Sequence, residues 1–513
     1  MELKVKLIGI QTFNTTLVIL ETSDAFKLGA KPGDRVRIYK RGEDKEVSRG
    51  YTGVVDIATS EQILQSGTIG LYEHTFKNLG FKKEKEQDYI VDIEMSSKPQ
   101  SFNYIAKKIR GELLTKSEIN AIIHSITDGH HTPIELAAFI TAIETRELVN
   151  KEIISLCEAM TYSGEVLEFG DNVFDKHSTG GVPGNKVTLL IVPIVAASGL
   201  FIPKTSTRAI TSPSGTADSM ECLAPIAFEP DHLKELLKKK VVIAWGGAIR
   251  MAPADNILIN IEKPLGMDPP GLMIASILSK KMCMGVKKLV LDIPCGPGTK
   301  FKDLREGRKF ATLFNEIAAA VGIECICALT NAIQPVGHGI GPALEAREAL
   351  AALQDPKNAP SSLVNKSVEL SGILLEMGGK AQKGQGQDLA REILTSGEAY
   401  AKMKEIIQLQ GGNPEIQVED IPIGPYSQEM YALSDGFVSD IDNQSINRIA
   451  KLAGCPGCKP CGILLKAKIG SKITKGQVVL VIYSNSKEKL KEAVEYYRAH
   501  PPLVLGGMII ETV

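Results

Sequence analysis

The amino-acid sequence predicts an α/β protein built around a large mixed or parallel sheet, with a helical lobe, a β-rich N-terminal domain and a small α+β, barrel-like C-terminal domain. Three observations support this fold class. Apolar and polar residues alternate over about the first 95 residues, the period becomes helical from Phe102 to Phe169, and strand-like and helix-like runs then alternate to about residue 427. Strands that alternate with helices indicate a largely parallel sheet covered on both faces.

The length and charge of the chain narrow the functional classes. Its 513 residues suffice for roughly two to four domains. With 59 basic and 60 acidic residues the net charge is −1, so no global field favours nucleic acid or an anionic membrane. The first residues do not resemble a signal peptide, and the longest uncharged apolar run, 187–203, is shorter than the ~20 residues of a spanning helix. We expect a cytoplasmic enzyme with no nucleic-acid or membrane partner.

The N-terminal half divides into two predicted domains. Residues 1–96 read as strands separated by turn signals, and residues 96–100 as a linker. A helical lobe is expected over 97–170, joined by about 256–286. Ser117 and Glu118 are predicted to cap its second helix. His130 and His131 are expected in an exposed turn, because two adjacent histidines rarely share a metal.

The alternation of strands and helices over 171–427 predicts the α/β domain. Residues 187–203 are expected to form a buried helix followed by a strand. Strands are predicted at 289–293 and 325–329, with a long helix at 301–321 between them. Strands return after a break at 411–414, so residues 428–513 are expected to form the C-terminal α+β domain.

Two polar loops each follow strand-like residues and precede helix-like ones, so both are expected at the carboxyl edge of the sheet, where ligands bind. Residues 176–186 read Lys-His-Ser-Thr-Gly-Gly-Val-Pro-Gly-Asn-Lys, and residues 206–218 read Ser-Thr-Arg-Ala-Ile-Thr-Ser-Pro-Ser-Gly-Thr-Ala-Asp. Lys176 and Arg208 supply one cation each, and glycines let backbone N–H groups turn inward. The loops suit one or two phosphates; a pair of tight polar turns is the alternative.

A third feature is the helix predicted after Asp268. Asp268 precedes two prolines and is expected to cap this helix. Ser276 and Lys280 are four residues apart and project from one face. From the residues alone this face is either a binding surface or a solvated one.

Lys-His-Ser-Thr-Gly-Gly at 176–181 and Gly-Thr-x-Asp-x-x-Glu at 215–221 resemble motifs of the thymidine/pyrimidine-nucleoside phosphorylase family. The wording of 206–218, with Val-Pro-Gly-Asn-Lys before it, is closer to the archaeal AMP phosphorylase branch of that family. The resemblance spans nearly the whole chain. The family's base-recognition helix, Ala-Ser-Ile-Leu-Ser-Lys-Lys, is present at 275–281.

The resemblance implies phosphorolysis of AMP, with CMP and UMP as further candidate substrates, to free base and ribose 1,5-bisphosphate. Inorganic phosphate is the implied co-substrate, and no other cofactor or metal is implied. Asp268 matches the proton donor. Lys176, Ser178, Ser206 and Thr216 match the phosphate cradle, and His177 and Lys280 are candidate base contacts. The matches to AMP contacts are Gly181, Thr207, Arg208, Ala209, Ile210, Thr211, Ser212, Thr216, Ser276 and Lys300.

The resemblance also implies a homodimer or larger homo-oligomer assembled through the N-terminal domain.

One departure from the family's motifs separates its two branches. Pyrimidine phosphorylases carry Tyr-x-x-Arg-Asp before the base helix, whereas residues 257–263 here read Ile-Leu-Ile-Asn-Ile-Glu-Lys. This favours a purine nucleotide. A pyrimidine nucleoside phosphorylase, an anthranilate-type phosphoribosyltransferase and a non-enzymatic binding module are the alternatives; the transferase would need an acidic metal-diphosphate site that the sequence does not display.

Cys455, Cys458 and Cys461 form two overlapping Cys-x-x-Cys pairs outside the motifs of the family. Three thiolates are one ligand short of the usual four-coordinate zinc site. A metal site, a disulfide and a cysteine-rich turn all stay open at this point.

Overall fold

The structure, a computed structural model, describes residues 1–10, 16–42, 50–84, 89–170, 172–209, 212–238, 241–246 and 251–506. The chain divides into two compact units. The first comprises Met1–Gly164 and Ala252–Ser279, and the second comprises Glu165–Met251 and Lys280–Val513.

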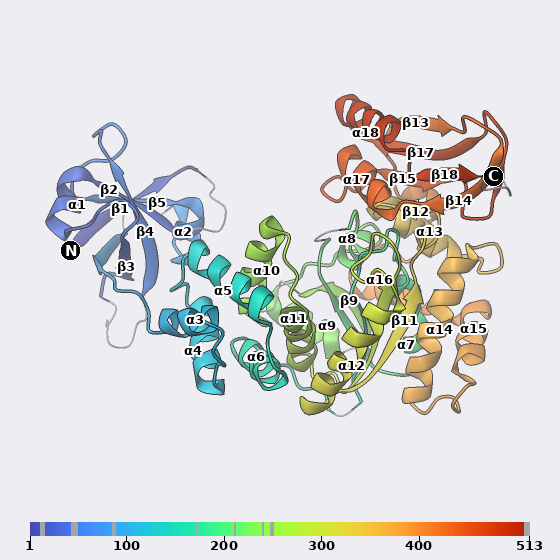
Figure 1. Cartoon of the computed structure of the whole chain (residues 1–513), viewed down its shortest axis with the longest axis horizontal. Coiled ribbons are helices and arrows are strands. Elements are labelled where there is room, and N and C mark those ends of the chain that lie inside the picture. Colours follow the sequence, from blue (N-terminus) through green and yellow to red (C-terminus); the bar gives the residue numbers. More distant parts are fainter. Residues whose placement is uncertain are drawn as a thin grey trace, which may run out of the picture. The chain divides into compact units, whose positions relative to one another are not determined.

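Six strands of the first unit close into a barrel (Figure 1). Around the barrel they are β1 (Glu2–Ile8), β5 (Thr68–Tyr72), β2 (Leu17–Glu21), β4 (Tyr51–Ala58), β3 (Arg35–Lys40) and β6 (Ile90–Met95), with helices α1 (Thr22–Leu28) and α2 (Glu73–Asn78) following β2 and β5. The β1–β5 and β2–β4 pairs are parallel, and β6 pairs with β1 to close the ring. Alternate residues such as Val36 and Ile38 fill the interior, and closure leaves no open sheet edge.

The helical part of the first unit contains α3 (Ser101–Ile109), α4 (Lys116–Thr127), α5 (Pro133–Arg146), α6 (Asn150–Tyr162), α10 (Pro253–Leu265) and the first turns of α11 (Pro270–Cys283). The cap of α4 differs from the prediction. Thr115, in extended conformation, accepts a hydrogen bond from the Glu118 N–H at 3.3 Å, and the Glu118 carboxylate accepts one from the Thr115 N–H at 2.8 Å. Glu118 was placed correctly, but Ser117 lies inside the helix, where its backbone cannot act as the cap.

The prediction of an exposed turn for both histidines was wrong for His131, which is buried. Its Nε2 lies 2.9 Å from the Ser101 hydroxyl, and its Nδ1 lies 3.4 Å from a Glu135 carboxylate oxygen. Arg35, from the barrel strand β3, donates to the same carboxylate and to the His130 carbonyl oxygen at 3.0 Å. A buried polar network therefore joins the barrel to the helices of the same unit.

The centre of the second unit is a parallel sheet. One part has the order β11 (Glu324–Asn331), β10 (Lys288–Cys295) and β7 (Phe174–Ser178), and the other pairs β8 (Ile202–Ser206) with β9 (Val241–Trp245). A parallel bridge between Val173 and Phe201 links the two parts. Because all five strands run the same way, the loops that follow them emerge at one edge.

Helices cover this sheet, as the predicted fold class requires (Figure 1). They are α7 (Thr188–Ala197), α8 (Thr216–Met220), α9 (Pro230–Lys238), α12 (Leu304–Ala320), α13 (Pro342–Gln354), α14 (Ser361–Met377), α15 (Gly386–Thr395) and α16 (Glu398–Leu409), with a short 3₁₀ turn at η3 (Val418–Asp420). The run 187–203 forms α7, buried on all sides, and then β8, as predicted. In the described parts of the chain, no helix is long and apolar enough to cross a membrane.

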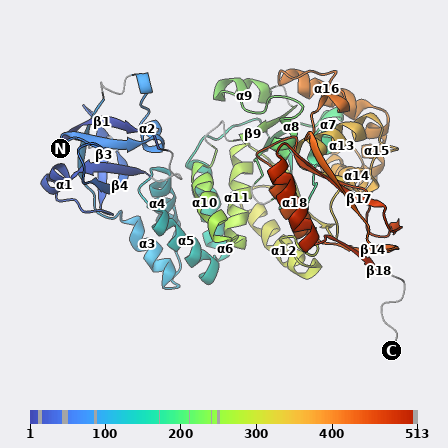
Figure 2. The same cartoon turned by 90° about the horizontal axis from the view of Figure 1, so that it is seen from above.

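The C-terminal part contributes two small sheets and two helices, α17 (Asn443–Ala453) and α18 (Lys487–Ala499). One sheet has the order β12 (Gly339–Ile340), β15 (Gly462–Leu465), β17 (Val478–Ser484) and β13 (Tyr426–Tyr431), and the other β16 (Lys472–Ile473), β14 (Gly436–Ile441) and β18 (Leu503–Gly506). Figure 2 shows α18 packed along β17. Since β12 immediately precedes α13, the C-terminal sheet begins inside the α/β segment.

We predict that Arg35→Met destabilises the first unit by about 3–5 kcal/mol, because it leaves the buried Glu135 carboxylate without its cation. Burial opposes ionisation of Glu135, but hydrogen bonds from His131 and Thr132 and the charge of Arg35 hold its pKa at about 2. The contribution is therefore complete above about pH 4.5 and is lost as the pH falls toward 2. The difference between variant and parent in urea unfolding should shrink over that interval.

The matched control is Arg110→Met, which removes an exposed arginine paired with Glu112 at 2.9 Å. Exposed pairs contribute about 0–1 kcal/mol, so this variant should unfold like the parent. Equal midpoints for both variants would show that the pair of Arg35 with Glu135 does not stabilise the first unit.

Candidate active site

The polar loops of the second unit meet at the carboxyl edge of its sheet. The first loop, residues 179–187, follows β7, and the second loop, described at residues 207–209 and 212–215, follows β8. Residues 296–303 follow β10, and residues 332–338 follow β11. The Lys204 ammonium donates to the Lys176 carbonyl oxygen at 2.9 Å and so ties β8 to β7. The two loops predicted from the sequence therefore lie beside each other, with a third and a fourth loop contributing to the same edge.

The first loop presents a hydroxyl proton. Ser178 Oγ accepts hydrogen bonds from the Gly180 N–H at 3.2 Å and from the Asn185 side-chain amide at 3.1 Å. With both lone pairs occupied, the Ser178 proton can only be donated, and an anion is the natural acceptor. Thr179 is buried, and its hydroxyl oxygen has no hydrogen-bond partner in the described parts of the chain.

Glycines allow this loop to sit against its neighbours. At Gly181, where φ is +93°, a Cβ would lie 3.0 Å from the Lys300 backbone nitrogen. At Gly184 a Cβ would lie 2.5 Å from the Val336 carbonyl oxygen. The Lys186 ammonium then donates to the carbonyls of Val336 at 3.1 Å and Gly339 at 2.8 Å. The loops after β10 and β11 thus hold the first loop in place.

Beneath the loop lie two buried charge clusters, each with two lysines and one aspartate. Asp292 is 3.6 Å from the Lys176 ammonium and 3.1 Å from that of Lys366. Asp175 is 3.2 Å from the Lys204 ammonium and 2.5 Å from that of Lys281. With all six groups ionised, the lysines exceed the aspartates by two positive charges.

Such an excess is unfavourable in a buried site unless an anion compensates it. Burial, with neighbouring lysines adding to its effect, lowers the pKa of Lys176 to about 8 and that of Lys204 to about 7. Burial and the surrounding lysines also push the pKa of His177 well below its usual range, so its imidazole is neutral at neutral pH. A bound dianion would favour the protonated lysines. The excess of lysines over aspartates at this edge therefore favours the binding of an anion.

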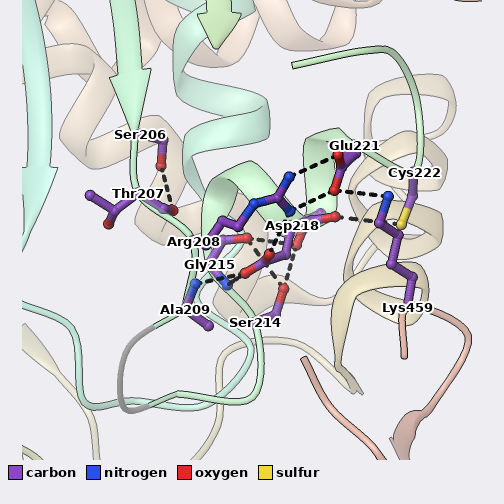
Figure 3. A network of polar contacts seen from close by, with 11 residues as sticks. Ser206, Thr207, Arg208, Ala209, Ser214, Gly215, Asp218, Glu221, Cys222 and Lys459 are labelled. Carbon is purple, nitrogen blue, oxygen red and sulfur yellow. Dashed lines mark hydrogen bonds and ion pairs between the residues drawn. The ribbon is translucent and has the colours of Figure 1, made fainter. Parts of the chain in front are cut away.

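The second loop is closed by one carboxylate (Figure 3). Asp218 accepts from the Ala209 N–H at 2.7 Å and from the Gly215 N–H at 2.9 Å, which joins the two ends of the loop. Gly215 is needed for this approach, because a Cβ there would lie 2.8 Å from the Ala209 nitrogen.

Arg208 does not point to an open anion site in this structure. Its guanidinium donates to Glu221 twice, at 2.6 and 2.9 Å, and to Asp218 at 3.3 Å (Figure 3). Lys459, from the C-terminal part, binds Glu221 at 2.8 Å. Arg208 foremost, with Lys459, holds the pKa of Glu221 at about 2. The charge of Arg208 is therefore largely matched within the protein, and the loop is left with backbone N–H groups and hydroxyls as its donors.

The other predicted residues lie on several elements. Ser206, Thr207, Ser212 and Thr216 lie on or beside the second loop, with Thr216 as the first residue of α8, and Lys300 lies on the loop after β10. Lys280 follows in α11 on the second unit, whereas Asp268 and Ser276 belong to the first unit. Asp268 is two positions before Pro270, the first residue of α11. Ile210 and Thr211 lie outside the described residues.

Sequence reasoning missed Asp175, Asp292, Lys204, Lys281 and Lys366. Asp292 offered a signal, because a charged residue inside the apolar strand 289–293 needs a buried partner. Lys204 and Lys366 lie on distant elements and offered none, and Lys281 was noted only as the last residue of the base-recognition motif at 275–281. In the described chain no group of three or more His, Cys, Asp or Glu side chains is arranged to hold a metal ion, and all nine cysteines are free thiols. The disulfide considered for Cys455, Cys458 and Cys461 is thus not formed here.

Comparison with known proteins defines the class first. Residues 170–400 match the "Glycosyl transferase family, a/b domain", residues 102–164 match its helical bundle domain, and residues 437–502 match the "Pyrimidine nucleoside phosphorylase C-terminal domain". Anthranilate phosphoribosyltransferase from Thermus thermophilus shares the fold, with a TM-score of 0.50 and 20% identity over 60% of this chain and 98% of that chain. These matched domains, together with the shared fold, define the class of the chain as a pentosyl-transferring enzyme.

Full-length relatives define the family more closely. The chain is 44% identical to the AMP phosphorylase of Methanococcoides burtonii over 100% of this chain and 99% of that protein. It is 43% identical to the AMP phosphorylase of Methanocaldococcus jannaschii over the same shares, and 40% identical to that of Methanosarcina acetivorans over 97% and 96%. The chain belongs to the AMP phosphorylase family, which confirms the resemblance drawn from its loops.

We predict that Gly181→Ala weakens the binding of inorganic phosphate by about tenfold or more, because the new Cβ would push the first loop away from Lys300. Isothermal titration with phosphate measures the effect. Gly180→Ala is the matched control: φ there is also positive, at +80°, but nothing lies within 4 Å of the added Cβ. Equal losses in the two variants would attribute the effect to backbone strain alone and contradict the role of the Gly181 contact.

Proposed function

We propose that this chain catalyses the phosphorolysis of AMP. A phosphate oxygen forms a bond to C1′ of the ribose, the bond from C1′ to the base nitrogen breaks, and the base leaves with the electron pair and takes up a proton. The products are adenine and ribose 1,5-bisphosphate. The observation that carries the proposal is the full-length similarity to proteins named AMP phosphorylase, and the site supplies the physical support.

The phosphate cradle is proposed to consist of Lys176, Ser178, Ser206 and Thr216. The transition state of glycosyl transfer develops positive charge at C1′, so a phosphate dianion held beside it is electrostatically stabilising. Lys176 belongs to a cluster with more cationic than anionic groups, and Ser178 has a proton to donate. Both features favour the dianion over water as the occupant.

AMP is proposed to contact the second loop and three further positions. The loop offers hydroxyls and backbone N–H groups to the 5′-phosphate, since Arg208 is engaged by Glu221. The proposed contacts are Gly181, Thr207 to Ser212, Thr216, Ser276 and Lys300. His177 and Lys280 are proposed to face the base, with His177 acting as a neutral hydrogen-bonding group because its pKa is lowered.

Inorganic phosphate is proposed as the sole co-substrate, without a metal or organic cofactor. CMP and UMP are proposed as additional substrates. A homo-oligomer assembled through the N-terminal barrel and a cytoplasmic location complete the proposal.

The test is release of free base from AMP with and without phosphate. We expect adenine only when phosphate is present, no loss of rate on addition of a chelator, and much slower turnover of thymidine. Release of adenine without phosphate would indicate a hydrolase. Equal turnover of thymidine and AMP would favour the pyrimidine nucleoside branch instead.

Asp268→Asn is expected to retain AMP binding and to lower turnover by roughly 10²–10⁴, the usual contribution of general acid catalysis. The purine leaves readily only when it is protonated, and an amide cannot supply that proton. If Asp268 serves only the helix α11, asparagine is nearly as good there and activity stays normal. Turnover within a few-fold of the parent, at equal thermal stability, would remove Asp268 from the mechanism.

A further inference from the structure

Asp292 on β10 is fully buried and contacts side chains from four other elements. Its Oδ1 accepts from the Thr330 hydroxyl of β11 at 2.6 Å. Its Oδ2 lies 3.1 Å from the Lys366 ammonium of α14, 3.6 Å from the Lys176 ammonium of β7 and 3.2 Å from the Asn185 amide nitrogen of the first loop. A single carboxylate thus organises two cations and one amide below the predicted phosphate cradle.

The carboxylate determines which way the Asn185 side chain points. Only its NH₂ group can face Asp292, because the amide oxygen would be repelled there. The same nitrogen donates to Ser178 Oγ at 3.1 Å. Together with the Gly180 N–H, at 3.2 Å, this leaves the Ser178 proton as an outward donor. The direction of that proton is therefore a consequence of the charge on Asp292.

Lys366 contributes charge rather than a hydrogen bond. Its ammonium is buried and makes no hydrogen bond in the described parts of the chain, although Asp292 is close. One carboxylate between two ammonium groups leaves one positive charge over. Any anion that enters the cradle is attracted by both lysines, even if it contacts only Lys176.

We propose that Asp292 and Lys366 are positioning residues of the phosphate cradle, with Asp292 orienting Lys176 and the Ser178 hydroxyl and Lys366 supplying a second positive charge for the phosphate dianion. This inference rests on the proposed phosphorolysis for its substrate. Neither Asp292 nor Lys366 belongs to a motif of the two loops.

The two residues act on Lys176 with opposite sign. Burial lowers the pKa of Lys176 to about 8, Asp292 raises it and Lys366 lowers it further. Asp175 on β7 also raises this pKa. Lys204 on β8 is a further neighbouring cation, and His177 is neutral. Loss of the Asp292 charge therefore lowers the pKa of Lys176, whereas loss of Lys366 raises it.

The experiment measures the apparent KM for phosphate against pH in Asp292→Asn and Lys366→Met. We expect KM for phosphate at neutral pH to rise by about tenfold to a hundredfold in both variants, with KM for AMP little changed. KM for phosphate should rise at alkaline pH as Lys176 loses its proton, and we call the pH of this rise the alkaline limit. The alkaline limit should move to lower pH in Asp292→Asn and to higher pH in Lys366→Met. A general loss of stability cannot move this limit in two directions.

Two further variants separate orientation from charge. Asn185→Leu breaks the link from Asp292 to Ser178 and leaves both lysines in place, so it should raise KM for phosphate without moving the alkaline limit. Lys366→Arg keeps the charge and should restore most of the phosphate affinity. Both variants also keep the test decisive if Asp292→Asn does not fold.

Glu152→Gln is the control for loss of a buried ion pair. Glu152 is buried in the first unit, 2.9 Å from the Lys108 ammonium, and its loss should lower Tm without changing KM for phosphate or the alkaline limit. Unchanged KM for phosphate in folded Lys366→Met and Asn185→Leu, or shifts of the limit in the same direction, would overturn the inference. If AMP is not a substrate, titration with inorganic phosphate still decides it, because the parent should bind phosphate at least tenfold more tightly than these variants.

Discussion

The constraint on which the second unit depends is the burial of four lysines with only two aspartates under the carboxyl edge of a parallel sheet. Lys176, Lys204, Lys281 and Lys366 come from β7, β8, α11 and α14, and Asp175 and Asp292 hold them in place. Removing these charges from water is costly, and the aspartates offset only part of that cost. The positive charge that the aspartates do not neutralise can be compensated by a bound dianion. The interactions that join these elements therefore also favour an anion at this edge.

The two loops at this edge differ in how their charges are balanced. The first lies next to the lysine clusters and presents the Ser178 hydroxyl, which accepts two hydrogen bonds within the protein and can donate its proton to a ligand. The second is internally balanced, since Asp218 closes its backbone and Glu221 matches the charge of Arg208. A phosphate that attacks C1′ needs charge beside it, whereas a 5′-phosphate that only anchors the substrate can be held by N–H groups and hydroxyls. The difference between the loops agrees with this division of tasks.

Contacts between distant parts of the chain hold both loops. Lys186 reaches the carbonyls after β11, and Lys459 in the C-terminal part binds the Glu221 that grips Arg208. The Asn443 amide of α17 donates to the Ala332 carbonyl at 2.8 Å. The C-terminal part therefore packs behind the loops and restrains them. Its three cysteines lie next to this restraint and remain thiols.

Local patterns in the sequence were enough to predict the fold class, the alternation of strands and helices, the two loops and their family, because period, turn residues and motif wording are local properties. They also placed Glu118 at a helix start and predicted α7 followed by β8 from residues 187–203. They could not place His131, whose partners Ser101 and Glu135 are 30 residues upstream and one helical turn on, with Arg35 beyond them in the barrel. They gave no partner for Arg208 and no connection from Asp292 to Lys366. These pairings follow from the folded chain alone, because a buried charge takes its meaning from groups that folding brings within a few ångströms of it, and no local pattern records which groups those are.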